Sequence, residues 1–357
     1  MVLYMRIPRQ IVVETSLKCN LKCTHCPSVD PSINKYGERV FMDVDFYKSI
    51  VDRIVKEKMN TSITGCLNGE SLLHPNIYEM FKYTADKKIP FYITTNSSIW
   101  HEEVFQLATD DNSCYQIIMS NNGLFTPNSS AIEKCMPGIQ RNKSKQNIER
   151  FIQLREKKGK ENFQIGIKIC KRGQDQEELE HIISYWLENG ADFVIIGRIL
   201  DDVKNGMRMF PCRHFDDMAM YIRADGNVVP CSFNIHMANE HAMDIGKLNE
   251  TESLIKFYNK HEYLQLRFKH YTGEFPWPCS ECAIAYTGDG VEGELHFRNP
   301  KLSQRTIYFH DDYSNTFYSY KPRKTRVSYL RQWESDEDII KWVKKSGMDL
   351  NFEYQIK

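Results

Sequence analysis

The stretch QIVVETSLKCNLKCTHC, residues 10–26, joins a strand pattern to a group of three cysteines. Residues 10–15 are rich in β-branched side chains, which is typical of a strand inside a sheet. Cys19, Cys23 and Cys26 follow in the next loop, separated by three and two residues. Closely spaced thiols in a reducing compartment are typical metal ligands. The loop therefore predicts a metal site with three protein ligands and room for one further ligand.

Outward from this loop, residues 10–200 alternate strand patterns with amphipathic helical patterns. Further strands are expected at residues 61–66, 91–95, 115–120, 163–170 and 192–197. Helical patterns lie at residues 47–58, 77–87, 146–158 and 176–188. Such alternation predicts an α/β fold with a parallel sheet and right-handed crossovers, either open or closed into a partial barrel.

Three groups of polar residues follow the ends of these strands. The cysteine loop follows the first strand, Glu70 follows the second, and Ser120 ends the fourth. Because the carboxyl ends of parallel strands meet at one edge of the sheet, we expect these residues on one rim. That rim is the predicted catalytic edge.

The charge balance and the apolar pattern argue against several classes of protein. The chain has 357 residues, and its 47 basic side chains balance 47 acidic ones without a run of five like charges. This composition disfavours nucleic acid as a partner. No apolar run approaches the length of a membrane span and no signal-peptide pattern is present, so we expect a cytoplasmic protein. Thiols stay reduced there, so the eleven cysteines favour metal binding over disulfides.

Two kinds of metal site fit the spacing of the three cysteines. Zinc prefers four nitrogen or sulfur ligands in a closed tetrahedron, which His25 would complete. A four-iron cluster held by three thiolates keeps one iron open for a small-molecule ligand. The spacing alone leaves both alternatives open.

The motifs along residues 10–200 resemble, in type and order, those of the radical S-adenosylmethionine (SAM) superfamily. CNLKCTHC resembles the CxxxCxφC loop of that family, with His25 at the aromatic position φ. NGESLLHP at residues 68–75 resembles its GGEP-type motif. ITTNS at residues 93–97 resembles the third-strand segment of the family, and IMSNNG at residues 118–123 resembles its fourth-strand segment.

The resemblance implies a partial (β/α)6 TIM-like barrel that binds a [4Fe-4S] cluster and SAM. The three cysteines would hold the cluster, and the amino and carboxylate groups of SAM would chelate its fourth iron. The implied reaction is reductive cleavage of SAM to a 5′-deoxyadenosyl radical, which abstracts hydrogen from a substrate C–H. Glu70 would hold the methionine ammonium. The residues implied in cofactor binding are His25, Asn68, Gly69, Glu70 and Ser120. The sequence departs from the GGEP pattern at Asn68 and Ser71, where the family has Gly and Pro.

The strand pattern FQIGIKIC, residues 163–170, has two distinct faces. The apolar face, expected to pack on helices, comprises Phe163, Ile165, Ile167 and Ile169, and the polar face comprises Gln164, Gly166, Lys168 and Cys170. Lys168 is a candidate for cofactor binding, and a lysine that reaches solvent is the alternative. Cys170 and Cys66 end strands at the rim and are candidate hydrogen-atom donors to a substrate radical.

A second group of cysteines comprises Cys212, Cys231, Cys279 and Cys282. Asp225 and Gly226 lie between two strand patterns before Cys231 and predict a hairpin turn. This arrangement resembles the SPASM and Twitch auxiliary-cluster domains that follow many radical SAM barrels. It implies a second [4Fe-4S] cluster ligated by all four thiolates. A zinc ribbon is the alternative.

We expect three segments along the chain. They are a radical SAM core barrel at residues 1–206, a SPASM/Twitch-like α+β auxiliary domain at residues 207–285, and an α+β extension at residues 286–357. The resemblance to enzymes with Twitch domains implies oxidation (dehydrogenation) of a small molecule of the sugar or aminocyclitol type, with flavodoxin or ferredoxin as the one-electron reductant. The alternatives are a redox-neutral epimerase, an enzyme that modifies a ribosomally made peptide, and a non-catalytic iron-sulfur or zinc protein for electron transfer or scaffolding. Neither nucleic acid nor a membrane is expected as a partner.

Overall fold

The described part of the chain forms one mixed sheet with helices against it. The computed structural model describes residues 7–23, 26, 41–65, 67–121, 140–160, 163–170, 176–197, 219–231, 243–276, 279–281 and 293–298. Within these ranges ten strands are hydrogen-bonded in the order β10-β6-β5-β4-β3-β2-β1-β7-β8-β9.

The centre of the sheet is parallel and follows the chain order. Its strands are β1 (Gln10–Val13), β2 (Ser62–Thr64), β3 (Phe91–Thr95), β4 (Cys114–Ser120), β5 (Gln164–Cys170) and β6 (Phe193–Gly197). Each strand pairs in parallel with the next. The predicted parallel α/β arrangement is confirmed, and the partial barrel stays a prediction.

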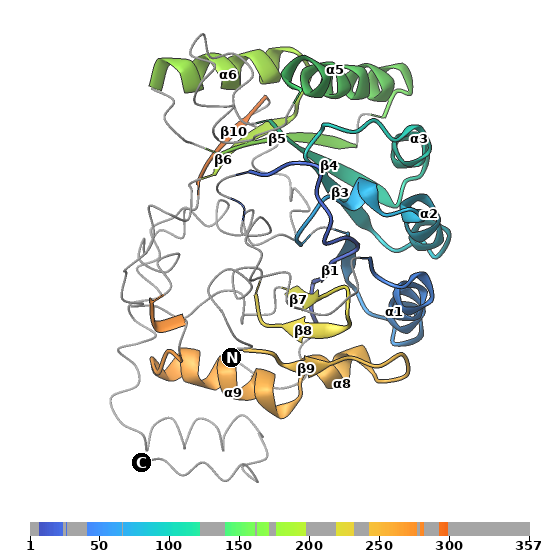
Figure 1. The fold of residues 1–357 in the computed structure, drawn as a ribbon, viewed down its shortest axis with the longest axis vertical. Coiled ribbons are helices and arrows are strands. Elements are labelled where there is room, and N and C mark those ends of the chain that lie inside the picture. The colour runs from blue at the N-terminus through green and yellow to red at the C-terminus, as the bar shows by residue number, and fades with distance from the viewer. Residues whose placement is uncertain are drawn as a thin grey trace.

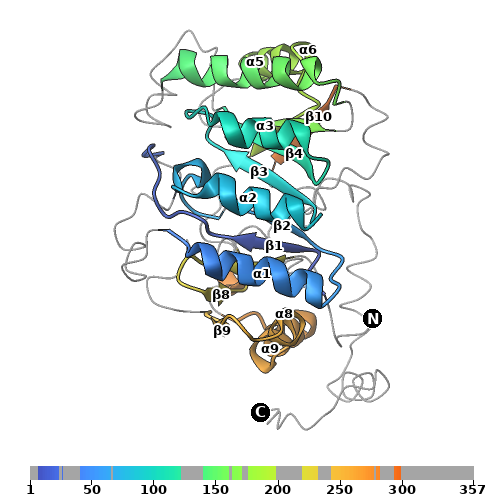
Figure 2. The same cartoon turned by 90° about the vertical axis from the view of Figure 1, so that its right-hand side faces the viewer.

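The helices that return the chain between these strands lie on the outer side of the curved sheet (Figures 1 and 2). They are α1 (Val44–Lys56), α2 (Ile77–Asp86), α3 (Glu102–Asp110), α5 (Arg141–Lys157) and α6 (Gln176–Glu188). Four were expected within a few residues of these bounds, whereas α3 was not predicted. The first helix shows why the bounds are sharp: the Asp43 carboxylate accepts a hydrogen bond from the backbone N–H of Phe46 at 3.0 Å and caps the helix.

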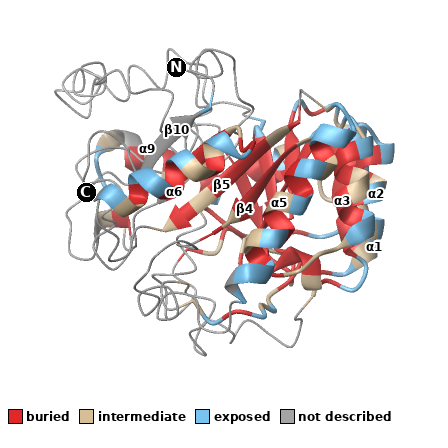
Figure 3. Ribbon diagram, turned by 90° about the horizontal axis from the view of Figure 1, so that it is seen from above, coloured by how far each residue is buried: buried red, intermediate tan, exposed pale blue. Residues whose placement is uncertain are grey.

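The two faces of β5 differ as its alternation predicts. Ile165, Ile167 and Ile169 are fully buried in the main core, together with Ile148 of α5 and Trp186 of α6. Lys168 and Cys170, on the opposite face, are only half-buried. Figure 3 shows this layering as buried strands lined by helices whose outer faces are exposed. The helix-free face of β5 therefore carries its polar groups.

A small apolar cluster covers the helix-free face at the middle of the sheet. It consists of Tyr92, Ile118, Phe193 and Ile195 from strands β3, β4 and β6. Gly166 lies opposite Phe193 in the β5–β6 register, and a Cβ there would come within 2.1 Å of two ring carbons of Phe193. The ring thus occupies the space that a side chain at Gly166 would need. Lys168 lies one step closer to the carboxyl rim, on the same face.

Three further strands extend the sheet beyond β1. They are β7 (Ala219–Ile222), which pairs in parallel with β1, and then β8 (Asn227–Val229) and β9 (Gly246–Lys247), which are antiparallel. Gly226 lies in the turn between β7 and β8 at φ +86°, a conformation that favours glycine. The predicted hairpin is confirmed, but its pairing with β1 was not foreseen.

Helix α1 is tied to the segment that follows β9. That segment contains α8 (Leu254–Tyr258), α9 (His261–Thr272) and the short helix η6 (Cys279–Glu281). Arg53 of α1 donates to the carbonyl oxygens of Asn249 and Glu252 at 2.7 and 2.9 Å. The Glu57 carboxylate accepts from the backbone N–H groups of Leu254 and Ile255 at the amino end of α8, at 2.9 Å each. These bonds satisfy amide groups that a helix start otherwise leaves unpaired.

In the expected α+β extension, the stretch GELHF forms β10 (Gly293–Phe297), which pairs antiparallel with β6. The rest of the expected extension, residues 286–292 and 299–357, lies outside the described residues. In the described ranges, no helix has the length and apolar character needed to cross a lipid bilayer.

Substitution of Gly166 should destabilise the sheet through its contact with Phe193. Gly166→Ala is expected to lower the free energy of unfolding by about 1–3 kcal/mol, the usual cost of overpacking. In the Phe193→Leu background the same substitution should cost clearly less, as measured by denaturant unfolding under anaerobic conditions. Gly159→Ala is the control, because Gly159 has φ +63° and no atom within 4 Å of the position that a Cβ would take, so its cost is backbone strain alone. Equal costs of Gly166→Ala in both backgrounds would contradict the contact.

Candidate functional site

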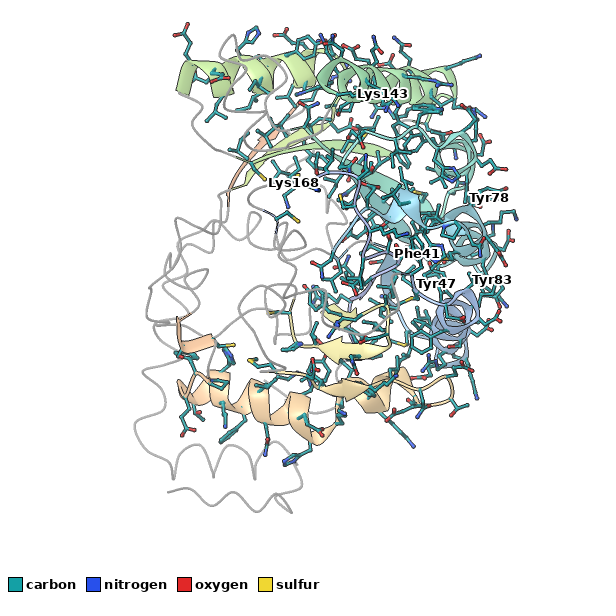
Figure 4. All side chains as sticks on the ribbon, in the orientation of Figure 1. Phe41, Tyr47, Tyr78, Tyr83, Lys143 and Lys168 are labelled. Atoms are coloured by element: carbon teal, nitrogen blue, oxygen red, sulfur yellow. The ribbon has the colours of Figure 1, made fainter. Side chains whose placement is uncertain are left out.

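The predicted rim residues lie at the carboxyl ends of neighbouring strands. The cysteine loop leaves β1, Glu70 follows β2, Ser120 ends β4, and Cys170 ends β5. Ser120 and Lys168 are opposite each other in the β4–β5 register. Figure 4 shows Lys168 on the side of the sheet away from the helices. His25 and Cys66 lie outside the described residues.

The three thiols of the loop influence one another electrostatically. Burial, then the charges of Cys26, Cys19 and Cys170, raises the pKa of Cys23 to about 12. Burial also raises the pKa of the Cys19 thiol. Because thiolates at this loop repel one another, bound iron would stabilise them, and soft thiolate donors fit an iron-sulfur cluster. Within the described residues, no three possible ligands form a group compact enough for one metal ion.

Cys170 is a fourth thiol, which lies outside the cysteine loop at the end of β5. It is among the charges that raise the pKa of Cys23, although the two residues are far apart in the sequence. One of the two candidate hydrogen-atom donors therefore acts electrostatically on the cysteine loop.

Glu70 is a buried carboxylate held by three hydrogen bonds. Its Oε1 accepts from the Leu72 backbone N–H at 3.1 Å and from the Thr95 hydroxyl at 2.9 Å, and its Oε2 accepts from the Asn96 backbone N–H at 2.7 Å. Burial raises the pKa of Glu70, and these hydrogen bonds oppose the rise. A carboxylate fixed in this way is oriented in advance for a cationic group.

The turn before Glu70 packs against the chain that leads to Cys19. Gly69 has φ +69°, and a Cβ there would lie 2.2 Å from the carbonyl oxygen of Ser16. The backbone N–H of Glu70 donates to the carbonyl oxygen of Lys18 at 2.7 Å. Only glycine fits this close approach, so the turn and the cysteine loop are fixed relative to each other.

Both departures from the GGEP pattern have a structural role. Asn68 donates from Nδ2 to Oε1 of Glu14 at 2.7 Å, a bond that glycine could not make. Ser71 begins the short helix η3 (Ser71–Leu73), and its hydroxyl donates to the carbonyl oxygen of Gly65. A hydrogen bond therefore holds the chain where the family pattern has a proline.

A set of polar side chains after β3 connects Glu70 with Cys19. Asn96, whose backbone binds Glu70, points its Nδ2 at Cys19 Sγ, 3.6 Å away, and at Asn20 Oδ1, 3.0 Å away. Asn20 in turn donates to the Ser98 hydroxyl at 2.8 Å. The sequence motif ITTNS pointed to this segment, but the roles of Thr95, Asn96 and Asn20 were not predicted.

Two of the four predicted auxiliary ligands lie in the described residues. Cys231 follows β8, is half-buried, and packs against the cluster formed by Val12, Ala219, Tyr221 and Val229. Leu67, which precedes Asn68, packs on the same cluster. Cys279 begins η6 and is buried against Met243, with the two sulfur atoms 3.8 Å apart. Cys212 and Cys282 lie outside the described residues.

A model of the SPASM family, described as an iron-sulfur cluster-binding domain, matches residues 212–283. The match begins at Cys212 and ends one residue after Cys282. The match favours an iron-sulfur domain in this part of the chain over the zinc-ribbon alternative.

Two curated proteins are similar in sequence. The tungsten-containing aldehyde ferredoxin oxidoreductase cofactor-modifying protein of Pyrococcus furiosus is 22% identical over 335 residues, which are 80% of this chain and 90% of that protein. The AdoMet-dependent heme synthase of Methanosarcina barkeri is 27% identical over 99 residues, which are 28% of this chain and 27% of that protein.

Among solved structures, SuiB of Streptococcus suis bound to S-adenosylmethionine has a similar fold. The TM-score is 0.56 at 16% identity, over 73% of this chain and 68% of SuiB. SuiB bound to the precursor peptide SuiA gives a TM-score of 0.57 at 16% identity, over 73% and 67% of the two chains. These likenesses support the α/β fold with its parallel core.

Iron content tests the two groups of cysteines. Anaerobically reconstituted protein should carry about eight irons with matching labile sulfide, from two four-iron clusters. Replacement of Cys19, Cys23 and Cys26 together by Ala should remove about half of the iron. Cys114→Ala is the control, because Cys114 is buried at the start of β4 and should not affect iron content. Zinc without labile sulfide in the wild type would contradict both cluster assignments.

Glu70→Gln should weaken SAM binding while the iron content stays unchanged. The neutral amide loses the ionic hydrogen bond to the ammonium, worth about 1.5–3 kcal/mol, which corresponds to about tenfold or more in Kd. Calorimetric titration with SAM measures this. Thr95→Val removes one neutral donor but leaves the charge, so its effect should be smaller. A Glu70→Gln protein with full iron content and the wild-type Kd would show that Glu70 does not bind the ammonium.

Proposed function

We propose that this chain, a radical SAM enzyme with a SPASM iron-sulfur domain, oxidises a small molecule at a carbon that bears a hydroxyl group, of the sugar or aminocyclitol type. The observation that carries the proposal is Glu70, a buried carboxylate beside the cysteine loop with its two oxygens oriented by Leu72, Thr95 and Asn96. When bound, the cluster and SAM supply a 5′-deoxyadenosyl radical able to abstract hydrogen from a C–H bond.

The residues of the chain bind and orient the reactants on the helix-free face of the sheet. Glu70 binds the ammonium of SAM, and the Gly69 turn keeps that carboxylate next to Cys19. Ser120 and Lys168, opposite each other near the ends of β4 and β5, would also hold SAM. The cluster of Tyr92, Ile118, Phe193 and Ile195 forms an apolar floor beneath them, which keeps water from the reacting carbon.

An oxidation needs an acceptor for an electron. After hydrogen abstraction, the substrate radical loses one electron and its hydroxyl loses one proton, which leaves a carbonyl group. A cluster held by Cys212, Cys231, Cys279 and Cys282 has no open iron for a ligand and can accept that electron. The order of strands in the sheet supports this role. Cys231 follows β8, which pairs with β7, and β7 pairs with β1, the strand that leads to Cys19. The segments that carry Cys231 and Cys19 are therefore joined through three adjacent strands.

A small molecule is the proposed substrate class because of the relative from Pyrococcus furiosus. That protein is described as cofactor-modifying, and the match covers 90% of it. A peptide substrate, suggested by SuiB with its precursor peptide, is the alternative that substrate trials would reveal. A non-catalytic electron carrier or scaffold is disfavoured, since such a protein has no need for a carboxylate buried at the cluster loop.

A redox-neutral epimerase is the second candidate, and Cys170 favours it. This thiol ends β5 on the face that carries Lys168, close enough to the cysteine loop to raise the pKa of Cys23. A thiol there could return a hydrogen atom to the substrate radical, and Cys66 is a further candidate. The thiyl radical that this leaves would take one electron from the one-electron reductant and one proton from solvent to restore the thiol. In that case the SPASM cluster would not take part in the net reaction.

Two sets of variants separate the candidates, with product and 5′-deoxyadenosine measured by mass spectrometry. We expect Cys279→Ala with Cys282→Ala to abolish oxidised product while SAM cleavage persists, and Cys170→Ala and Cys66→Ala to remain active. Melting curves must show that the double variant is folded, because metal binding and folding are coupled. If Cys170→Ala instead stalls after hydrogen abstraction, and wild-type product in D2O carries deuterium at the abstracted carbon, the enzyme is an epimerase.

A further inference from the structure

Glu14 is a buried carboxylate that has no role in the proposed binding of SAM or of the two clusters. It follows β1 directly and is fully buried. Its Oε1 accepts from Nδ2 of Asn68 at 2.7 Å, and its Oε2 accepts from the backbone N–H of Ala224 at 3.0 Å. Its own backbone N–H donates to the carbonyl oxygen of Ile222 at 2.8 Å. One side chain thus joins the turn before Glu70 to the turn between β7 and β8.

A carboxylate in this position is costly to bury. Burial raises the pKa of Glu14, and the bonds from Ala224 and Asn68, with the positive charge of Arg223, oppose the rise. Arg223 is also buried and forms an ion pair with Asp225 at 3.5 Å. A buried polar network of this kind fixes one geometry, because each donor that loses its acceptor leaves an unsatisfied group.

Both partners of Glu14 lead directly to a functional group. Asn68 is followed by Gly69, which packs on the Ser16 carbonyl, and by Glu70. Ala224 lies in the turn that leads into β8, and Cys231 follows shortly after that strand. A shift of the Glu14 carboxylate would therefore move the turn that carries Glu70 and the hairpin that carries an auxiliary ligand.

We infer that Glu14 is a positioning residue that couples SAM binding to the β7–β8 hairpin of the SPASM domain. It holds the 68–70 turn and the hairpin in one register, so that each is ordered only when the other is in place. The inference rests on the proposed role of Glu70 in SAM binding. It does not depend on the substrate or on the outcome of the reaction.

The test compares Glu14→Ala and Glu14→Gln in the reconstituted holoenzyme. Glu14→Ala removes both acceptors and should raise the Kd for SAM about tenfold, the lower end of the effect of residues that support a ligand-binding group. Glu14→Gln keeps a polar group of the same shape and should restore most of the affinity. Iron content should stay at the wild-type level in both variants. SAM affinity is measured by calorimetry, without any substrate.

Asp192→Asn is the matched control. Asp192 is a partly buried carboxylate of the sheet, which pairs with Arg155 and accepts from the backbone N–H of Ile165 at 2.7 Å. It precedes β6 at the amino edge of the sheet, away from the rim. Its substitution should lower the melting temperature as Glu14→Ala does but leave the Kd for SAM unchanged. A merely structural role of Glu14 would give the same result for both carboxylates.

Hydrogen exchange measures the coupling itself. In the wild type, SAM should slow exchange of the backbone amides in residues 219–231, and in Glu14→Ala this effect of SAM should be lost. If Glu14→Ala does not fold, Asn68→Ala, which removes only one donor, should also weaken SAM binding and speed exchange at Ala224.

Three results would overturn the inference: an unchanged Kd for SAM in folded Glu14→Ala or Asn68→Ala, an equal rise in Kd for Asp192→Asn, or no effect of SAM on the hairpin of the wild type. Failure of the proposed function would look different. A wild type that binds SAM through Glu70 but forms no oxidised product would leave the coupling through Glu14 intact.

Discussion

The site depends on the close approach of Gly69 to the carbonyl oxygen of Ser16. A side chain at residue 69 would collide with the backbone between β1 and Cys19, so the turn after β2 can pack there only with glycine. From that contact the rest follows: the Glu70 amide reaches Lys18, its carboxylate reaches the loop after β3, and Asn96 in that loop reaches Cys19. The turn after β2 and the loop after β3 are thus fixed around the loop that follows β1.

The sheet divides its two faces between stability and chemistry. The face toward the helices is a continuous core of buried aliphatic and aromatic side chains. The other face carries the small apolar cluster, in which the ring of Phe193 fills the space beside Gly166. Polar groups lie at the rim beyond this cluster. Parallel strands buried on one side by helices can hold side chains at fixed positions on the other, as the proposed radical chemistry would require.

Local patterns predicted those parts of the structure that local interactions determine. The alternation in FQIGIKIC gave the two faces of β5, and the amphipathic pattern of α6 gave its bounds correctly. The order of motifs located the cysteine loop, Glu70 and Ser120. Sequence reasoning did not find Glu14, because its partners are 54 and 210 residues away and nothing in QIVVET distinguishes a buried carboxylate from one at a strand end. The parallel pairing of β7 with β1 was missed for the same reason.

The pairing of β10 with β6 has a consequence for the synthesis of the protein. Residues 293–297 complete the sheet on one side, although every strand from β1 to β6 is made before residue 198. On the ribosome, β6 therefore emerges long before its outer neighbour and presents an open edge to other nascent chains. The same edge would be exposed in any form of the protein cut between the SPASM match and residue 293. Such a product should aggregate unless a chaperone binds it, even with all seven cysteines of the two groups present.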